Sequence, residues 1–188
     1  MDERTLVHRS KLLSKTLRHQ PSLAGLTLGD GGWVAVDDLL RGLRERAGVT
    51  LTRAELDEVV ANNNKRRFAY DETGTRIRAS QGHSVAVDLE LTETPPPETL
   101  YHGTGARAAA SIQREGLRKM RRHHVHLSAD IPTALKVGAR HGPPVVFAVA
   151  AGEMARDGMS FYRSDNGVWL VDEVEPHYLA LISPIEGD

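Results

Sequence analysis

The stretch Thr94-Pro95-Pro96-Pro97-Glu98 divides the sequence into two parts of different character. Three consecutive prolines remove three backbone N–H donors and hold the chain extended, so neither an α-helix nor a central β-strand can continue through them. We therefore place a domain boundary here and expect two domains, residues 1–94 and 95–188. Each is long enough to form a hydrophobic core of its own.

The part before the prolines has the element order of a winged helix, which is three helices followed by a β-hairpin. The first helix carries Leu6, Leu13 and Leu17 on one face, and Pro21 ends it. A capping box at residues 52–55 opens the third helix. The expected elements are a helix over 5–20, a short strand over 33–36, a helix through Leu39, Leu40 and Leu43, a helix with Leu56, Val59 and Val60 inside, and hairpin strands over 68–70 and 76–78.

The part after the prolines changes to short strands separated by brief helices, which indicates an α+β domain. The expected strands cover residues 100–102, 125–127, 145–149, 168–171 and 178–182, and the expected helices cover 106–115 and 131–140. The fold class predicted for the whole chain is therefore α+β. The pattern leaves open whether the strands of the second part form one sheet or two.

Composition narrows the class of protein further. Of the 188 residues, 40% are hydrophobic and 26% are charged, as in ordinary globular proteins. The absence of cysteine excludes disulfides, thiolate zinc sites and cysteine nucleophiles. No apolar run approaches the roughly 18–20 residues of a membrane span, and residues 1–10 lack the apolar core of a signal peptide. We expect a cytoplasmic protein that does not contact a membrane.

Basic residues are concentrated in three places, although the net charge is only −1. The first cluster lies in the first helix and consists of Arg4, Arg9, Lys11, Lys15 and Arg18, of which all but Arg9 share one arc. The second is Lys65-Arg66-Arg67, and the third is Arg114, Arg118, Lys119, Arg121 and Arg122 against Glu115 alone. Local clusters on a nearly neutral chain favour a bounded anionic ligand over long-range adhesion to nucleic acid. Solvated helix faces are the alternative interpretation.

Arg18 and His19 end the first helix side by side. An arginine can hold a phosphate through two hydrogen bonds, and a histidine can move a proton near neutral pH. The alternative is that both simply cap the negative end of the helix dipole. Two further candidate segments flank the hairpin. Before it lie residues 65–67, for which an exposed basic turn is the alternative. After it lies Gln81-Gly82-His83-Ser84, for which a polar loop is the alternative.

Residues 120–128 contain His123, His124 and His126 within four positions. Side chains alternate along a strand, so Arg122, His124 and His126 would share one face. With no cysteine and no nearby carboxylate pair to complete a ligand shell, a metal site is disfavoured. Contact with an anion or a nucleotide fits the pattern better.

The stretch Tyr101-His102-Gly103-Thr104-Gly105 ends a strand with a histidine, a glycine that permits close backbone approach, and a hydroxyl group. Neither the GxGxxG of dinucleotide-binding folds nor the GxxxxGK[ST] P-loop occurs anywhere in the chain. A Rossmann dehydrogenase and a P-loop kinase are therefore disfavoured.

These motifs together resemble the NAD-dependent RNA 2'-phosphotransferases of the KptA type, and the resemblance spans almost the whole chain. The motifs stand in the family's order: Leu17-Arg18-His19, Lys65-Arg66-Arg67-Phe68, Arg78-Ala79 with Gln81-Gly82-His83-Ser84, Tyr101-His102-Gly103-Thr104, Gly116-Leu117, Met120 with Arg122 and residues 124–128, and residues 166–170. The resemblance implies an amino-terminal winged-helix RNA-binding lobe, residues 1–94, and a carboxy-terminal NAD-binding lobe of ADP-ribosyltransferase fold, residues 95–188.

The resemblance also implies a reaction. Such enzymes transfer an internal RNA 2'-phosphate to NAD through an intermediate in which that phosphate is ADP-ribosylated. The products are 2'-OH RNA, nicotinamide and ADP-ribose 1'',2''-cyclic phosphate. NAD is consumed as a co-substrate, no metal is expected, and the partner is a tRNA-like RNA that carries an internal 2'-phosphate, as after tRNA splicing. We expect a monomer.

Site residues follow from the same resemblance. The implied catalytic residues are Arg18, His19, Arg67 and Arg122, and the implied NAD-binding residues are His102, Gly103, Thr104, His126, Leu127 and Ser128. Val168 stands where protein-modifying members of the fold carry a catalytic glutamate. Two other functions stay open: an ADP-ribosyltransferase that stops after the first step, and a non-catalytic winged-helix RNA-binding protein. Arg122 discriminates between them and the phosphotransferase, because a simple RNA-binding protein needs no cation from the NAD lobe.

Overall fold

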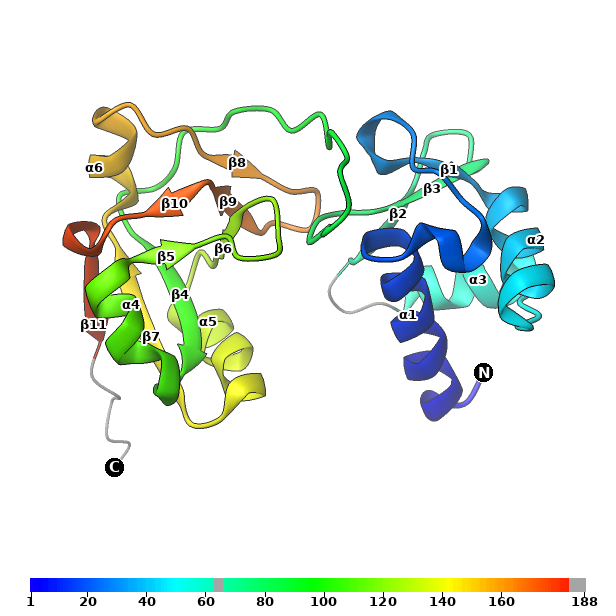
Figure 1. The fold of residues 1–188 in the computed structure, drawn as a ribbon, viewed down its shortest axis with the longest axis horizontal. Helices are drawn as coiled ribbons and strands as arrows, with labels where there is room; N and C mark the ends of the chain where they lie inside the picture. The colour runs from blue at the N-terminus through cyan, green and yellow to red at the C-terminus, as the bar shows by residue number, and fades with distance from the viewer. Residues whose placement is uncertain (63–65, 183–188) are drawn as a thin grey trace. The chain divides into compact units, whose positions relative to one another are not determined.

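The computed structural model describes residues 1–62 and 66–182 of the chain. Lys65, which belongs to one predicted basic cluster, lies outside the described residues. The chain consists of two compact units, Met1–Glu90 and Leu91–Asp188 (Figure 1). The boundary predicted at residues 94 and 95 falls a few residues inside the second unit. None of the helices in the described ranges has the length and apolar character needed to span a membrane.

The first unit contains the predicted helices and the predicted hairpin. Its elements are α1 (Glu3–Arg18), the 3-10 helices η1 (Pro21–Ala24) and η2 (Asp30–Gly32), β1 (Val34–Ala35), α2 (Val36–Ala47), α3 (Arg53–Ala61), β2 (Phe68–Tyr70) and β3 (Arg76–Ala79). The three strands form an antiparallel sheet in the order β1-β3-β2. The helix predicted over 5–20 begins two residues earlier and ends two residues earlier than expected.

Local hydrogen bonds explain where these elements begin and turn. The side chain of Asp2 accepts a hydrogen bond from the Thr5 N–H and starts α1. Thr52 and Glu55 form the predicted capping box of α3. In the hairpin, the Asp71 carboxylate accepts hydrogen bonds from the backbone N–H of Arg76 at 3.1 Å and from its side chain at 2.9 Å. The guanidinium of Arg76 is the main cause that lowers the pKa of Asp71 to about 2.

The core of the first unit lies between the helices and the sheet. Fully buried leucines come from α1, α2 and α3, and Ile77 comes from the central strand. The buried leucines are Leu13, Leu17, Leu39, Leu43 and Leu56. All of them belong to the apolar faces that the sequence pattern predicts, since each is spaced at helical periodicity from its neighbours.

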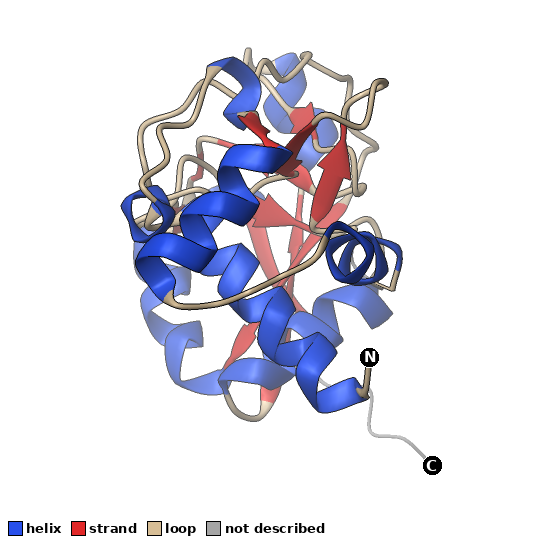
Figure 2. Cartoon of the chain, turned by 90° about the vertical axis from the view of Figure 1, so that its right-hand side faces the viewer, coloured by secondary structure: helices blue, strands red, loops and turns tan. Residues whose placement is uncertain are grey.

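The second unit contains mixed helices and short strands, so the α+β class is confirmed. Its elements are β4 (Leu100–Gly105), η3 (Ala106–Ala108), α4 (Ala109–Glu115), β5 (Leu117–Arg118), β6 (Val125–Leu127), α5 (Ile131–Gly138), η4 (Ala139–His141), β7 (Pro144–Val149), α6 (Ala151–Arg156), β8 (Tyr162–Arg163), β9 (Trp169–Val171), β10 (Glu173–Val174), η5 (Pro176–Tyr178) and β11 (Leu179–Ile182). Figure 2 colours the helices of the whole chain blue and its strands red.

The question of one sheet or two in the second unit is answered by its strand pairing. One antiparallel sheet has the order β11-β7-β4 and another the order β6-β9-β8, with β5 and β10 as a separate pair. Tyr101 of β4 and Ser128, just after β6, exchange two backbone hydrogen bonds of 2.9 and 2.7 Å. This bridge joins the edges of the two larger sheets at the point where the predicted NAD-binding residues lie.

Helix α5 lies directly against β4, and Gly103 makes this possible. A Cβ atom at position 103 would lie 1.7 Å from the Ala134 carbonyl oxygen and 2.5 Å from its carbonyl carbon. No L-residue with a side chain fits without separating the helix from the strand.

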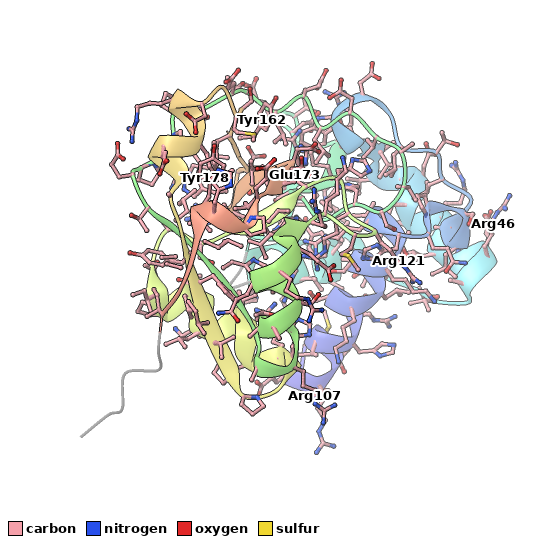
Figure 3. The ribbon with its side chains drawn as sticks, turned by 60° about the vertical axis from the view of Figure 1, so that its left-hand side comes forward. Arg46, Arg107, Arg121, Tyr162, Glu173 and Tyr178 are labelled. Atoms are coloured by element: carbon pink, nitrogen blue, oxygen red, sulfur yellow. The ribbon has the colours of Figure 1, made fainter. Side chains whose placement is uncertain are left out.

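Two polar contacts lie elsewhere in the second unit. Tyr178 donates a hydrogen bond to Asp157, and Glu173 forms an ion pair with Arg118. Figure 3 labels Tyr178 and Glu173.

Candidate functional site

In the first unit, the candidate residues gather around the end of α1. Arg18 is the last residue of the helix and His19 is its C-cap, with the His19 N–H bonded to the Lys15 carbonyl oxygen at 3.1 Å. The ring of His19 is exposed at the surface, and its Nδ1 lies 2.9 Å from the Ser84 Oγ. The Ser84 N–H donates to the Arg18 carbonyl oxygen, also at 2.9 Å. Ser84 thus fixes both the backbone of Arg18 and the ring of His19.

The segment that ends at Ser84, residues 80–84, also holds Arg67. The Ser80 N–H donates to the Arg67 carbonyl oxygen at 2.8 Å, and the Ser80 hydroxyl donates to the Arg66 carbonyl oxygen at 2.7 Å. Arg66 has a positive φ of 42°, which turns the chain immediately before β2. Residues 80–84 therefore connect two of the predicted catalytic arginines, one at each end of the segment.

Residues 81–84 are only in part the solvated polar loop that the sequence offered as the alternative, because Ser84 alone among them is exposed. Ser80, Gln81 and His83 are buried, and His83 is only 1% exposed. Gly82 has a φ of +84°, a conformation in which glycine avoids the strain of a side chain. Ser84 is one of the candidates that the sequence predicts, but its role is not predictable locally, because its partners lie more than sixty positions earlier in the chain.

In the second unit, His102, His126 and Arg122 form a hydrogen-bonded chain. Nδ1 of His102, on β4, lies 3.1 Å from the backbone carbonyl oxygen of His126, on β6. Nη1 of Arg122 lies 3.2 Å from Nδ1 of His126. The structure therefore brings His102 to Arg122 and His126, which lie at least twenty positions later in the sequence and four positions from each other.

These contacts determine where the ring protons are. A carbonyl oxygen only accepts, so His102 carries its proton on Nδ1 and presents Nε2 as an acceptor. Arginine only donates, so Nδ1 of His126 is the acceptor of that contact and a neutral His126 ring carries its proton on Nε2. Burial lowers the pKa of His102, and the positive charge of Arg122 lowers it further. His102 is consequently a neutral imidazole at physiological pH.

The remaining predicted NAD-binding residues differ in what they expose. Leu127 is 1% exposed and belongs to the hydrophobic core of the unit, so its side chain is not available to a ligand. Gly103 is buried under α5, whereas Thr104 and Ser128 are partly exposed. Their assignment to NAD binding stays a prediction, as does the expectation that no metal takes part.

Two further positions concern alternatives raised by the sequence. His124 is half-buried near the ring of Tyr162, and burial is the main cause that lowers its pKa.

Val168 is bonded to Ser164 through two hydrogen bonds. The Ser164 N–H donates to the Val168 carbonyl oxygen at 2.9 Å, and the Val168 N–H donates to the Ser164 hydroxyl oxygen at 3.2 Å. Val168 therefore occupies a hydrogen-bonded turn between β8 and β9 and supplies no charge there.

Comparison with known proteins decides the family. Residues 4–173 match the sequence model of one protein family, described as the RNA 2'-phosphotransferase, Tpt1 / KptA family. The chain belongs to this RNA 2'-phosphotransferase family. All the predicted site residues of both units lie inside the matched range.

Curated relatives agree with the family match along their whole length. A probable RNA 2'-phosphotransferase of Nostoc punctiforme is 56% identical over 182 residues, which are 97% of this chain and 100% of that protein. Proteins of the same description from Herpetosiphon aurantiacus and Streptomyces coelicolor are 56% and 55% identical over 181 and 184 residues, covering 96% and 98% of this chain and 99% and 100% of those proteins.

Proposed function

We propose that this RNA 2'-phosphotransferase family member transfers an internal RNA 2'-phosphate to NAD, giving 2'-OH RNA, nicotinamide and ADP-ribose 1'',2''-cyclic phosphate. In this proposal the first unit is a winged-helix RNA-binding lobe and the second an NAD-binding lobe of ADP-ribosyltransferase fold. The observation that carries it is the chain of contacts from Arg122 through His126 to His102, because it places a cation beside two histidines whose proton positions are fixed.

The residues of the second unit fit a ribose and its phosphates. Nε2 of His102 accepts a hydrogen bond, and ribose hydroxyl groups donate one. The low pKa of His102 keeps this acceptor available, since a protonated ring would have none. Arg122 adds a permanent positive charge next to it, as an anionic dinucleotide requires.

The first step needs little help from a base. NAD supplies an anomeric carbon with a good leaving group, nicotinamide. The nucleophile is the RNA 2'-phosphate, which is already an anion, so no proton has to be removed. The role of the second unit in this step is to orient the nicotinamide ribose through His102.

The second step requires proton transfer and charge stabilisation. A ribose 2''-hydroxyl group attacks phosphorus and the RNA 2'-oxygen leaves, so one proton is taken up and another delivered. His19 is the general acid and base for these proton transfers, and its contact with Ser84 orients the ring. Arg18, Arg67 and Arg122 neutralise the charge on the phosphoryl oxygens, which is the work that a metal ion performs elsewhere. A carboxylate at position 168 would compete for the attacking hydroxyl group, and the chain has valine there.

The proposal is tested by incubating a short RNA with an internal 2'-phosphate, with and without NAD and in excess EDTA, and by mass analysis of all products. We expect loss of the 2'-phosphate only when NAD is present, with nicotinamide released and EDTA without effect. The same RNA without the 2'-phosphate is the control and should release no nicotinamide. Accumulation of ADP-ribosylated RNA as the end product would instead indicate an ADP-ribosyltransferase.

Replacing Ser84 by alanine should lower kcat without changing the KM for NAD. The variant loses the contact with His19 Nδ1 but keeps the backbone hydrogen bond to Arg18. One hydrogen bond contributes about 0.5–1.5 kcal/mol, so kcat should fall by about tenfold or less. Steady-state kinetics and thermal unfolding measure the two effects. Ser84→Thr retains the hydroxyl group and should restore kcat, and a variant that only loses thermal stability would contradict the positioning role.

A further inference from the structure

The outward face of α1 is almost entirely basic. Apart from Glu3 in the first turn, its exposed residues are Arg4, Val7, His8, Lys11 and Lys15. Helical geometry puts the four basic positions within an arc of about 60°, opposite the buried leucines. The arc continues to the half-buried Arg18 at the end of the helix.

These basic residues differ from the arginines that stabilise the first unit. Arg41, Arg44, Arg53 and Arg76 each form an ion pair with an acid of the same unit. Within residues 1–62 and 66–182, no acidic side chain forms an ion pair with Arg4, Lys11 or Lys15, although all three are exposed. The face is therefore not neutralised from within the described part of the chain.

The arrangement is unfavourable for the helix itself. Lys11 and Lys15 are four residues apart and Lys15 and Arg18 three apart, spacings at which like charges repel, and of these three only Lys15 and Arg18 lie in the last turn, where the helix dipole favours cations. Arg4 lies in the first turn, where the helix dipole favours acids. A local rule that is broken without compensation inside the fold is typical of a functional surface.

We infer that this face of α1 binds the phosphodiester backbone of the RNA strand that flanks the 2'-phosphate. The inference rests on the proposed function, in which Arg18 contacts the 2'-phosphate. From Arg4 to Arg18 the helix rises by roughly 21 Å, at about 1.5 Å per residue. A stacked strand advances about 3.4 Å per nucleotide, so the face covers about six nucleotides. Phosphate contacts carry no base information, and the binding is therefore independent of sequence.

The experiment measures equilibrium binding by fluorescence anisotropy, without NAD, so that no reaction takes place. The RNAs are a 2'-phosphorylated dinucleotide and the same dinucleotide extended by about eight nucleotides on its 5' or its 3' side, which exceeds the length of the face. The variant is the triple substitution Arg4→Gln, Lys11→Gln and Lys15→Gln. The matched control removes three exposed charges from α2 through Arg41→Gln, Arg44→Gln and Arg46→Gln; Figure 3 labels Arg46, which extends away from the ribbon.

The triple variant of α1 should bind one of the two extended RNAs about tenfold more weakly or worse at low salt. Its salt dependence should fall by about 0.7 logarithmic units per charge removed, or about two in total. Affinity for the dinucleotide should change far less, and the α2 control should bind all RNAs like the parent protein. The folded state of the α1 variant should be about as stable as the parent, because the removal of like-charge repulsion offsets the loss of the favourable interaction between Lys15 and the helix dipole.

Other outcomes overturn the inference. Equal losses for the dinucleotide and the extended RNAs would mean that the face acts on the 2'-phosphate itself. An equal loss of affinity in the α2 control would show that the effect comes from net charge and not from this face. Unchanged binding of the extended RNAs would show that the face does not bind RNA. A parallel assay of nicotinamide release by the parent protein tests the proposed function separately, because the binding result does not depend on turnover.

Discussion

Replacing Arg122 by alanine is expected to slow the second step of the proposed reaction about a hundred- to a thousandfold, which corresponds to ~2.7–4 kcal/mol. The five-coordinate phosphorus of that step concentrates more negative charge than the phosphate that attacks in the first step. Arg67→Ala should act in the same way. RNA that carries ADP-ribose on its 2'-phosphate should therefore accumulate in both variants, and rapid-quench sampling with labelled RNA would measure it.

Two comparisons make this prediction specific. His102→Ala removes the acceptor for the nicotinamide ribose and should slow nicotinamide release, so no intermediate should accumulate. Arg121→Ala removes a neighbouring exposed arginine, labelled in Figure 3, and should react like the parent protein. Arginine variants that merely bind RNA poorly and form no intermediate at saturating RNA would contradict the assigned role.

Replacing Gly103 by alanine is expected to destabilise the second unit severely. The new Cβ would meet the backbone of Ala134, at 1.7 Å from its carbonyl oxygen, and a backbone atom cannot move aside by a change of rotamer. Overpacking usually costs about 1–3 kcal/mol and occasionally more, and this clash belongs at the upper end. The second unit has about 100 residues, and at that size a loss of about 3 kcal/mol lowers its melting temperature by roughly 12–24 °C.

The two tryptophans allow this effect to be localised. Trp33 lies in the first unit and Trp169 in the core of the second, so single-tryptophan variants report on each unit by fluorescence. Only the Trp169 signal should shift to lower temperature. Adding Ala134→Gly should not restore stability, because the clash involves the backbone and not the methyl group. Recovery in that double variant, or a shift of the Trp33 signal alone, would show that the packing explanation is wrong.

Gly103 also shows how one residue can satisfy two interpretations. The sequence predicts that its lack of a side chain permits close backbone approach, and the family resemblance implies that it binds NAD. The structure gives the same lack a packing reason, since α5 lies directly on β4 at this point. Sequence alone cannot separate the two, because both require the same residue type.

Elements with strong local signals were predictable from the sequence. Capping residues, a proline stop and leucines at helical spacing define α1 and α3, and the turn at Asp71 defines the hairpin. The helix α6 and the two-residue strands β5, β8 and β10 were missed. They are short, α6 has no capping side chain, and the strand pair β5 and β10 depends on residues more than fifty positions apart.

The candidate site was predictable as a set of residues but not as a set of contacts. Motif order identified Arg122, His102 and His126, whereas the hydrogen bonds among them depend on how two separate sheets meet at Tyr101 and Ser128. The burial of His83 was also unexpected, because a polar stretch between glycine and serine ordinarily predicts a solvated loop.

The segment from Ser80 to Ser84 has a consequence for natural variation. Its two ends bond to the backbone of Arg67 and of Arg18, so the number of peptide units between them sets the separation of those arginines. A one-residue insertion or deletion would move one arginine relative to the other, even if every remaining side chain were unchanged. We therefore expect a change of length in this segment to disturb the site more than Ser84→Ala does, because it moves backbone and not a single hydroxyl group.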